Sequence, residues 1–159
     1  MTVGMISPAP VRKVFTVQAS QEKAFDVFTA RMGDWWLKSH TISPAGQKAV
    51  VVEPFSGGRW YEIGHDGKEC EWGKVLDYSR PDRLVLAWQI SAEWAYDPQL
   101  LTEVEVRFVV VSASETRVEF EHRKLENYGV VADKVREVLG SDGGWTGLLA
   151  AFESVVLAG

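Results

Sequence analysis

One histidine in the last third of the chain is placed to act as a polar group inside an apolar interior. In the stretch Thr116–His122, polar and apolar residues alternate, and His122 falls in phase with Val118 and Phe120. Because successive side chains of a strand point to opposite faces, this phase predicts that His122 faces inward. An imidazole titrates near neutral pH and both donates and accepts hydrogen bonds, so it can orient a ligand or move protons.

A structural role is the competing interpretation of His122. Histidines at strand ends commonly hydrogen-bond to backbone or water, and catalysis needs a partner that orients the ring. The sequence assigns no such partner. We therefore name no catalytic residue, and we keep both interpretations of His122 open.

Seven tryptophans in 159 residues are the second unusual feature. They exceed what core packing usually requires, so we expect several to line a cavity for a small, mostly apolar ligand. The candidate ligand-binding residues either face inward by the alternation of predicted strands or lie in helices that would cover the sheet. They are Trp36, Trp60, Trp72, Trp88, Phe108, Phe120, His122, Trp145 and Leu149. Arg59 and Tyr61 are further candidates for orienting the ligand.

Core packing is the competing interpretation of these aromatic residues, and for Trp60, Trp72 and Trp88 it fits as well as cavity lining. Trp145, in the first turn of the last helix, would anchor that helix to the sheet. Adjacent helical positions point about 100° apart, so only one of Trp35 and Trp36 is expected to face inward. We choose Trp36. The aromatic segment Trp94–Leu100 has two open interpretations, a lid over the cavity or a homodimer contact.

Composition excludes several classes of function. The formal net charge is -5 and no run of Lys or Arg occurs, so we expect no nucleic-acid partner. No apolar run reaches the ~18 residues of a membrane span, and residues 1–10 lack the charged start of a signal peptide. The single Cys70 excludes an internal disulfide. We therefore expect a cytoplasmic protein without membrane insertion.

Metal and phosphate sites have no sequence support. The three histidines share no metal-ligand spacing, so we predict no metal and no cofactor. Gly57-Gly58 and Gly143-Gly144 lack the Gly-Lys-Ser/Thr ending of a phosphate loop. Glu69 and Glu71 share one strand face, which we interpret as solvated.

Apolar periodicity divides the chain into a flexible lead-in, residues 1–10, and one domain, residues 11–159. The domain begins with a strand at 11–17 and a helix with Ser20 as its N-cap, followed by a short helix around Trp35. About six strands, a helix at 127–139 and a long helix capped by Asp142 complete it. This order predicts an α+β fold in which an antiparallel sheet curves around the C-terminal helix.

The chain resembles the START-like, helix-grip (SRPBCC) superfamily. Within it, the chain is most similar to the activator of heat-shock-protein-90 ATPase homologue family in its single-domain bacterial form. Short motifs in a shared order carry the resemblance over roughly residues 11–157. They are Val17-Gln18-Ala19-Ser20 before Ala24-Phe25, Trp35-Trp36, Gly57-Gly58-Arg59-Trp60, Gly73-Lys74-Val75 before Pro81-Asp82-Arg83-Leu84, Glu121-His122 and Gly144-Trp145.

The resemblance implies an apolar tunnel between the sheet and the last helix. In the wider superfamily this tunnel binds lipids, sterols, hormones or polyketides, and some members are cyclases or aromatases. A binding protein for a lipid-like or aromatic ligand is our first hypothesis. A cyclase or aromatase that uses His122 in the same cavity is the second, and a chaperone-interacting module is the third.

Overall fold

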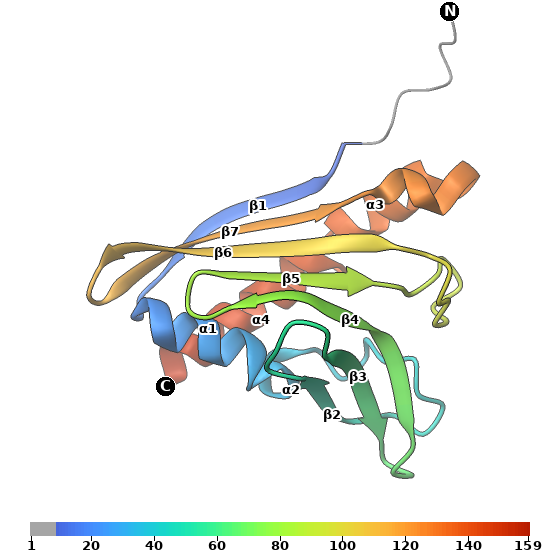
Figure 1. The fold of residues 1–159 in the computed structure, drawn as a ribbon, viewed down its shortest axis with the longest axis horizontal. Helices are drawn as coiled ribbons and strands as arrows, with labels where there is room; N and C mark the ends of the chain where they lie inside the picture. The colour runs from blue at the N-terminus through green and yellow to red at the C-terminus, as the bar shows by residue number, and fades with distance from the viewer. Residues whose placement is uncertain (1–8) are drawn as a thin grey trace, which may run out of the picture.

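The computed structural model describes residues 9–159. They form a seven-stranded antiparallel sheet, and the long C-terminal helix lies across one of its faces (Figure 1). This is the α+β helix-grip architecture that the order of elements predicts. The predicted lead-in, residues 1–10, lies almost wholly outside the described residues.

All neighbouring strands of the sheet are antiparallel. Their spatial order is β1-β7-β6-β5-β4-β3-β2, so the first strand pairs with the last and Val11 lies opposite His122. The strands are β1 (Val11–Val17), β2 (Gln47–Val52), β3 (Arg59–Gly64), β4 (Glu69–Ser79), β5 (Arg83–Trp88), β6 (Thr102–Ser112) and β7 (Glu115–Arg123).

The helices gather on the inner face of the sheet. They are α1 (Gln21–Thr29), α2 (Met32–Trp35), the 3-10 segment η2 (Leu125–Val131), α3 (Ala132–Gly140) and α4 (Trp145–Ala158). Ser20 caps α1 as predicted, since its side chain accepts the Lys23 N–H at 3.2 Å. The predicted single helix at 127–139 is wrong, because Gly129 has a φ of 68° and interrupts it. The predicted cap at Asp142 is also wrong, because Gly144 is the N-cap of α4.

One half of the interior is filled by aromatic packing. Phe152 of α4 packs edge to face against Phe28, at 5.1 Å between ring centroids, and against Trp35 at 5.6 Å. Phe108 of β6 packs on Phe25 at 5.3 Å. Such contacts pack α1 and the second half of α4 against β6 through aromatic side chains.

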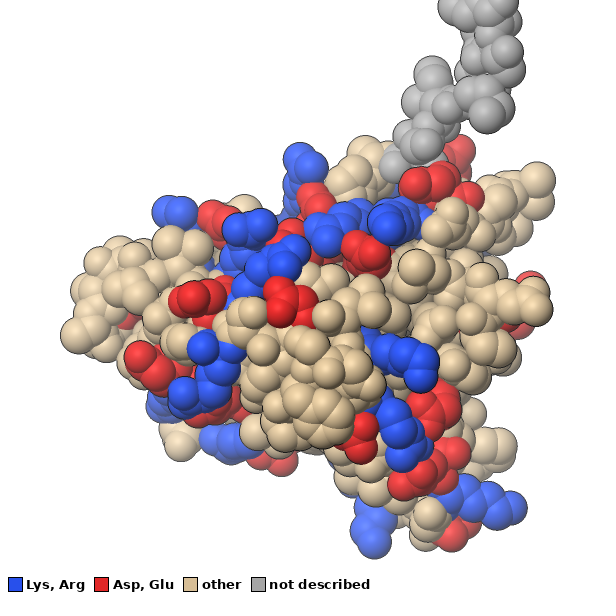
Figure 2. Space-filling view, viewed as in Figure 1, with Lys and Arg blue, Asp and Glu red and all other residues tan. Residues whose placement is uncertain are grey.

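The outer face of the sheet carries ion pairs. Figure 2 shows Lys and Arg side chains interspersed with Asp and Glu across the molecule in the orientation of Figure 1. Glu105 accepts from Arg83 at 2.5 Å and from Arg123 at 2.7 Å. Burial alone would raise the pKa of Glu105, but these hydrogen bonds outweigh it and lower the pKa. Because paired charges cover the outer face of the sheet, an apolar ligand site is expected on the inner face.

Candidate ligand cavity

A cavity of about 320 Å³ lies between the sheet, the start of α4 and the segment that follows α2. Five of the seven tryptophans line it: Trp36, Trp72, Trp88, Trp94 and Trp145. The remaining lining residues are Ser39, His40, Thr41, Ile42, Ile90, Val138, Leu139, Gly143, Gly144 and Leu148.

Trp36 is the central ring of the indole cluster. Its ring centroid lies 4.8 Å from that of Trp72, 5.6 Å from that of Trp145 and 6.3 Å from that of Trp88. These separations are typical of favourable aromatic contacts. Because the Trp36 indole N–H donates to the His40 carbonyl at 2.9 Å, the ring is also fixed in orientation. The cavity wall is therefore a packed surface of indoles.

Trp145 is held by a hydrogen-bonded chain that crosses the sheet. Its indole N–H donates to Nδ1 of His122 at 3.0 Å, and Nε2 of His122 lies 2.8 Å from the Thr102 hydroxyl. That hydroxyl donates to the backbone carbonyl of Trp88 at 2.8 Å. An indole can only donate and a carbonyl can only accept, so Nδ1 is the acceptor and Nε2 carries the hydrogen. The chain links Trp145 to the backbone of Trp88, whose ring also packs on Trp145 at 5.6 Å between centroids.

His122 itself does not border the cavity. It is fully buried, and this burial lowers its pKa to about 3. Both ring nitrogens already have partners within the protein, so neither is free to meet a ligand. In this structure His122 positions Trp145.

Trp88 is fixed from its other side by Tyr128 of η2. The Trp88 indole N–H donates to the Tyr128 hydroxyl at 3.0 Å, and that hydroxyl donates to the Ile90 carbonyl at 2.6 Å. Burial raises the pKa of Tyr128 to about 12, so the phenol stays protonated and keeps its donor role.

A buried carboxylate supports the part of the cavity wall that Thr41, Ile42 and Trp72 form. Glu62 of β3 has no exposed surface, and it accepts from the Thr41 hydroxyl at 2.5 Å and the Ile42 N–H at 2.7 Å. It also accepts the Trp72 indole N–H at 3.1 Å. Because all three donors belong to residues that line the cavity, Glu62 shapes the wall without bordering the cavity itself.

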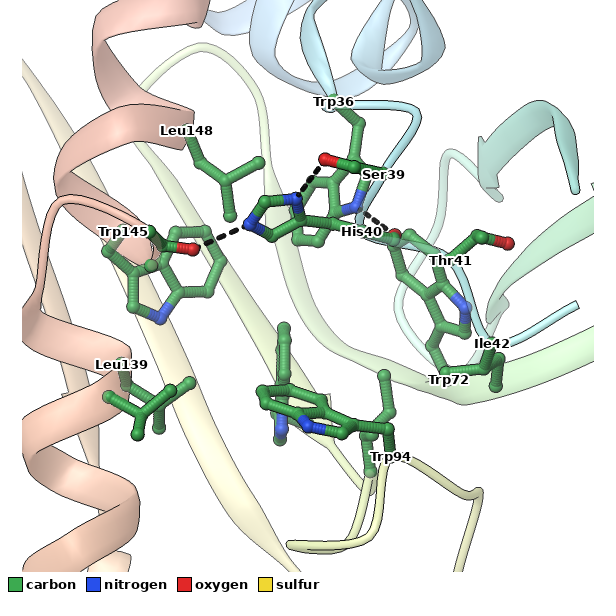
Figure 3. A pocket seen from close by; sticks show the side chains of 15 residues that line it. Trp36, Ser39, His40, Thr41, Ile42, Trp72, Trp94, Leu139, Trp145 and Leu148 are labelled. Atoms are coloured by element: carbon green, nitrogen blue, oxygen red, sulfur yellow. Dashed lines mark hydrogen bonds between the residues drawn. The ribbon is translucent and has the colours of Figure 1, made fainter.

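The polar part of the cavity comes from the segment that follows α2. Nε2 of His40 lies 2.6 Å from the Gly143 carbonyl, just before α4, and Nδ1 lies 3.0 Å from the Ser39 hydroxyl. Figure 3 shows the His40 ring between Trp145 and Trp36, with Ser39 above it. This contact joins two segments that are 103 residues apart in sequence.

Trp94 lies across the cavity from Ser39 and His40 (Figure 3). It lies in the loop between β5 and β6, its φ is 62°, and half of its surface is exposed. The loop is tied by the Ile90–Tyr96 bridge and by the Trp94 N–H, which donates to the Ser91 carbonyl at 2.9 Å. A half-exposed indole at a cavity mouth is placed to cover a bound molecule.

The structure brings together some of the nine candidate residues. Trp36, Trp72, Trp88 and Trp145 line the cavity. The other five are outside its lining: Trp60, Phe108, Phe120, His122 and Leu149.

Each of the five has a different partner. Trp60 packs behind the wall, 5.3 Å from Trp72 between ring centroids. Phe108 belongs to the filled half of the interior, and Phe120 packs on Trp145 at 4.5 Å. Leu149 borders a separate shallow depression beside β1. Strand phase identified inward residues but did not tell which part of the interior stays open.

Arg59 and Tyr61 are not cavity residues. The Arg59 guanidinium lies 4.0 Å from the centre of the Tyr61 ring and pairs with Glu69 and Glu71. These carboxylates raise the pKa of Arg59 through hydrogen bonds. Both candidates therefore contribute to the charged surface of β3 and β4.

Sequence reasoning missed the polar residues Ser39 and His40. No pattern along the chain shows that the segment with His40 lies against Gly143. The available signal was the neighbouring Trp35-Trp36 pair, because the chain that leaves a covering helix must pass the cavity mouth.

Two further properties of the described residues bear on the site. Within residues 9–159, no three side chains of His, Cys, Asp or Glu gather as a metal site would require. No helix in that part of the chain has the length and apolar character needed to cross a membrane.

Comparison with solved structures found relatives across nearly the whole chain. The anthrahydroquino-gamma-pyrone synthase Txn09, complexed with SUM, is 38% identical, with 94% of this chain and 97% of that chain covered and a TM-score of 0.65. The self-sacrificing resistance protein CalC from Micromonospora echinospora is 32% identical, with 93% and 94% covered and a TM-score of 0.71. Protein NE0264 from Nitrosomonas europaea is 14% identical, with 94% and 95% covered and a TM-score of 0.67, which shows the fold alone.

The comparison with curated proteins found no match. Residues 18–156 match the family described as Activator of Hsp90 ATPase homolog 1-like protein. This match spans both the sheet and α4, and it agrees with the helix-grip architecture. The chain therefore belongs to the Activator of Hsp90 ATPase homolog 1-like family, within the START-like superfamily.

Proposed function

We propose that this protein binds a flat, polycyclic aromatic molecule in the tryptophan-lined cavity. The observation that carries the proposal is that five indoles from separate segments converge on one space of about 320 Å³. Indole faces and edges offer large apolar contacts and favourable ring–ring geometry to an aromatic ligand. A ligand that buries its rings there would gain roughly 25 cal/mol for each Å² of apolar surface, before ordering costs.

The arrangement of polar groups supports a ligand with oxygen atoms at one end. Ser39, His40 and the Gly143 carbonyl gather at one side, while Trp72, Trp88 and Leu148 form apolar walls. A hydroxylated quinone has this division of polar and apolar surface. A saturated lipid chain would also contact the apolar walls, but it has no aromatic ring to stack on the indoles.

The relatives support an aromatic ligand class and leave the reaction open. Txn09 is an anthrahydroquino-gamma-pyrone synthase, so an oxygenated polycycle is a reasonable ligand class for a chain 38% identical to it. CalC, at 32% identity, is a resistance protein. Two different roles at comparable identity support a shared cavity more strongly than a shared reaction.

The position of Trp94 supports the lid interpretation of its segment. It lines the cavity and is half exposed, so a bound ligand would cover part of its free surface. The homodimer interpretation has no comparable support.

Fluorescence titration of the purified protein tests the proposal. We expect beta-hydroxyanthraquinone to quench tryptophan emission saturably and to raise the melting temperature, and palmitate to do neither. W94A should weaken binding by about tenfold, because one aromatic wall is lost. F55A is the matched control, since Phe55 is similarly exposed but outside the cavity lining. Tighter binding of palmitate than of the quinone would overturn the aromatic assignment.

An enzyme of the cyclase or aromatase type is the second candidate. The observation that favours it is the 38% identity to a synthase over 94% of the chain. A cyclase would need a group inside the cavity that moves protons. His122 does not border the cavity, so the second candidate depends on another residue.

A further inference from the structure

We propose that Ser39 and His40 form a proton-transfer pair that acts on an acidic hydroxyl of the bound ligand. The proposal rests on the aromatic-binding function above, because the cavity must first hold a phenol or enol beside Ser39. It assigns a chemical role to two residues that strand and helix patterns did not single out.

Hydrogen-bond directions define the state of His40. Nε2 of His40 lies 2.6 Å from the Gly143 carbonyl oxygen. A carbonyl oxygen only accepts hydrogen bonds, so Nε2 carries the hydrogen and Nδ1 presents a lone pair. The Ser39 hydroxyl, 3.0 Å from Nδ1, therefore donates to it. The ring is held in the tautomer of a general base directed at Ser39.

The Ser39 oxygen keeps acceptor capacity toward the cavity. A serine hydroxyl has one hydrogen and two acceptor lone pairs, and only its hydrogen is used by His40. Ser39 is exposed and lines the cavity, so an entering hydroxyl can reach it. A phenol that donates to Ser39 would complete a chain of three hydrogen bonds that ends at the Gly143 carbonyl.

The transfer along this chain balances without an oxidant, a reductant or a second substrate. The phenol proton passes to the Ser39 oxygen while the Ser39 proton passes to Nδ1 of His40. The products are a phenolate and an imidazolium, and the imidazolium keeps its hydrogen bond to the Gly143 carbonyl. If the phenolate oxygen then bonds to an electrophilic carbon of the same ligand, the proton returns from His40 to the atom that receives the displaced electron pair.

None of the charged groups that the structure describes near the cavity is placed to act as the base in place of His40. Among the described residues that line the cavity, His40 alone has a side chain with a basic nitrogen. Behind the wall, Glu62 is occupied by three donors. Lys38 Nζ lies 3.4 Å from the Gly33 carbonyl. Asp142 precedes Gly143 in sequence and is outside the lining.

The test uses the absorbance of beta-hydroxyanthraquinone, which changes when its phenol ionises. A nearby base that becomes a cation favours the phenolate, so the bound phenol should ionise with a pKa about one unit below that of the free probe. H40Q and S39A should each return it to the free value while affinity stays within about threefold. H65Q, the same change in an exposed turn outside the cavity, should behave as the wild type.

The two variants separate chemistry from structure. H40Q removes the base and also alters the link to Gly143, whereas S39A leaves that link in place. Saturable binding with the same phenol pKa in wild type, H40Q and S39A would overturn the proton-transfer pair and leave the binding function intact. Absence of saturable quenching in the wild type would overturn the binding function, and the proton-transfer pair with it.

Discussion

The indole N–H of Trp145 donates to Nδ1 of His122 across 3.0 Å, in an interior where neither residue is exposed by more than 1%. The contact places the one inward histidine of β7 under the first turn of α4. It explains why an imidazole occurs at an otherwise apolar strand position. His122 joins the helix to the sheet and fixes a tryptophan that lines the cavity.

Removal of the Trp145 donor should therefore destabilise the fold. W145F leaves Nδ1 of His122 buried without a partner, which should lower the free energy of unfolding by about 1–3 kcal/mol. Urea denaturation followed by circular dichroism measures it. W94F is the matched control, because within residues 9–159 the half-exposed Trp94 indole donates no hydrogen bond, and it should cost below about 0.5 kcal/mol. Equal losses in the two variants would contradict the role given to the hydrogen bond.

Acid should destabilise the protein through His122. Its pKa is about 3 when folded and 6.5 ordinarily, so the unfolded chain binds the proton more readily between these values. Stability is then fully present above about pH 6.5 and falls as the pH decreases, by up to about 1.4 kcal/mol for each pH unit. The pKa values of Glu103 and Glu105 are lowered from 4.5, so their contribution is lost at lower pH.

Denaturation between about pH 6.5 and 5 isolates the histidine from these carboxylates. H122Q should flatten the dependence in that interval. A second readout needs no variant: the imidazole C–H signals of His122 should not shift in nuclear magnetic resonance spectra over the same interval. A His122 signal that titrates there would contradict the buried neutral ring.

Loss of the buried carboxylate should affect both stability and binding. E62Q replaces one of the two acceptor oxygens by an NH2 group, so the side chain can no longer accept both from the Thr41 hydroxyl at one oxygen and from the Ile42 and Trp72 N–H groups at the other. We expect a loss of about 1–3 kcal/mol in unfolding free energy and weaker binding of beta-hydroxyanthraquinone. E119Q is the control, because Glu119 forms a surface ion pair with Arg117 and should contribute below about 1 kcal/mol. Unchanged affinity in E62Q would contradict its role in shaping the wall.

The adjacent glycines before α4 should differ in their tolerance of alanine. A Cβ at Gly144 would lie 2.4 Å from the carbonyl oxygens of Val138 and Leu139, whereas a Cβ at Gly143 meets no atom closer than 3.9 Å. G144A must displace α3 or the start of α4, so it should cost more than about 2 kcal/mol. G143A should cost below about 1 kcal/mol. Thermal melting of the two variants provides the comparison, and a larger loss in G143A would contradict this packing.

Local patterns along the chain predicted much of the fold. Strand alternation in β7, the Ser20 cap and the long last helix agree with the structure, because each depends on residues a few positions apart. The interruption at Gly129 was not predicted, because the apolar spacing of the residues around it is helical and does not reveal one residue with positive φ.

The site was predictable only in part. Inward phase pointed to Trp72 and Trp88, and helix position to Trp36 and Trp145, but the same reasoning also selected Phe108 and Phe120, which pack in filled regions. Whether an inward residue meets a cavity depends on the volumes of side chains from distant segments. No short pattern contains that information.

The sequence by itself determined the sheet, the covering helices and an interior rich in indoles, because these follow from periodicity and composition. Only the tertiary structure decided the chemistry of the two histidines. His122 is closed off by Trp145 and Thr102, while His40 meets Gly143 from 103 positions away and faces the cavity through Ser39. A histidine's proton chemistry depends on its hydrogen-bond partners and its burial, and in this fold chain segments far apart in sequence supply both.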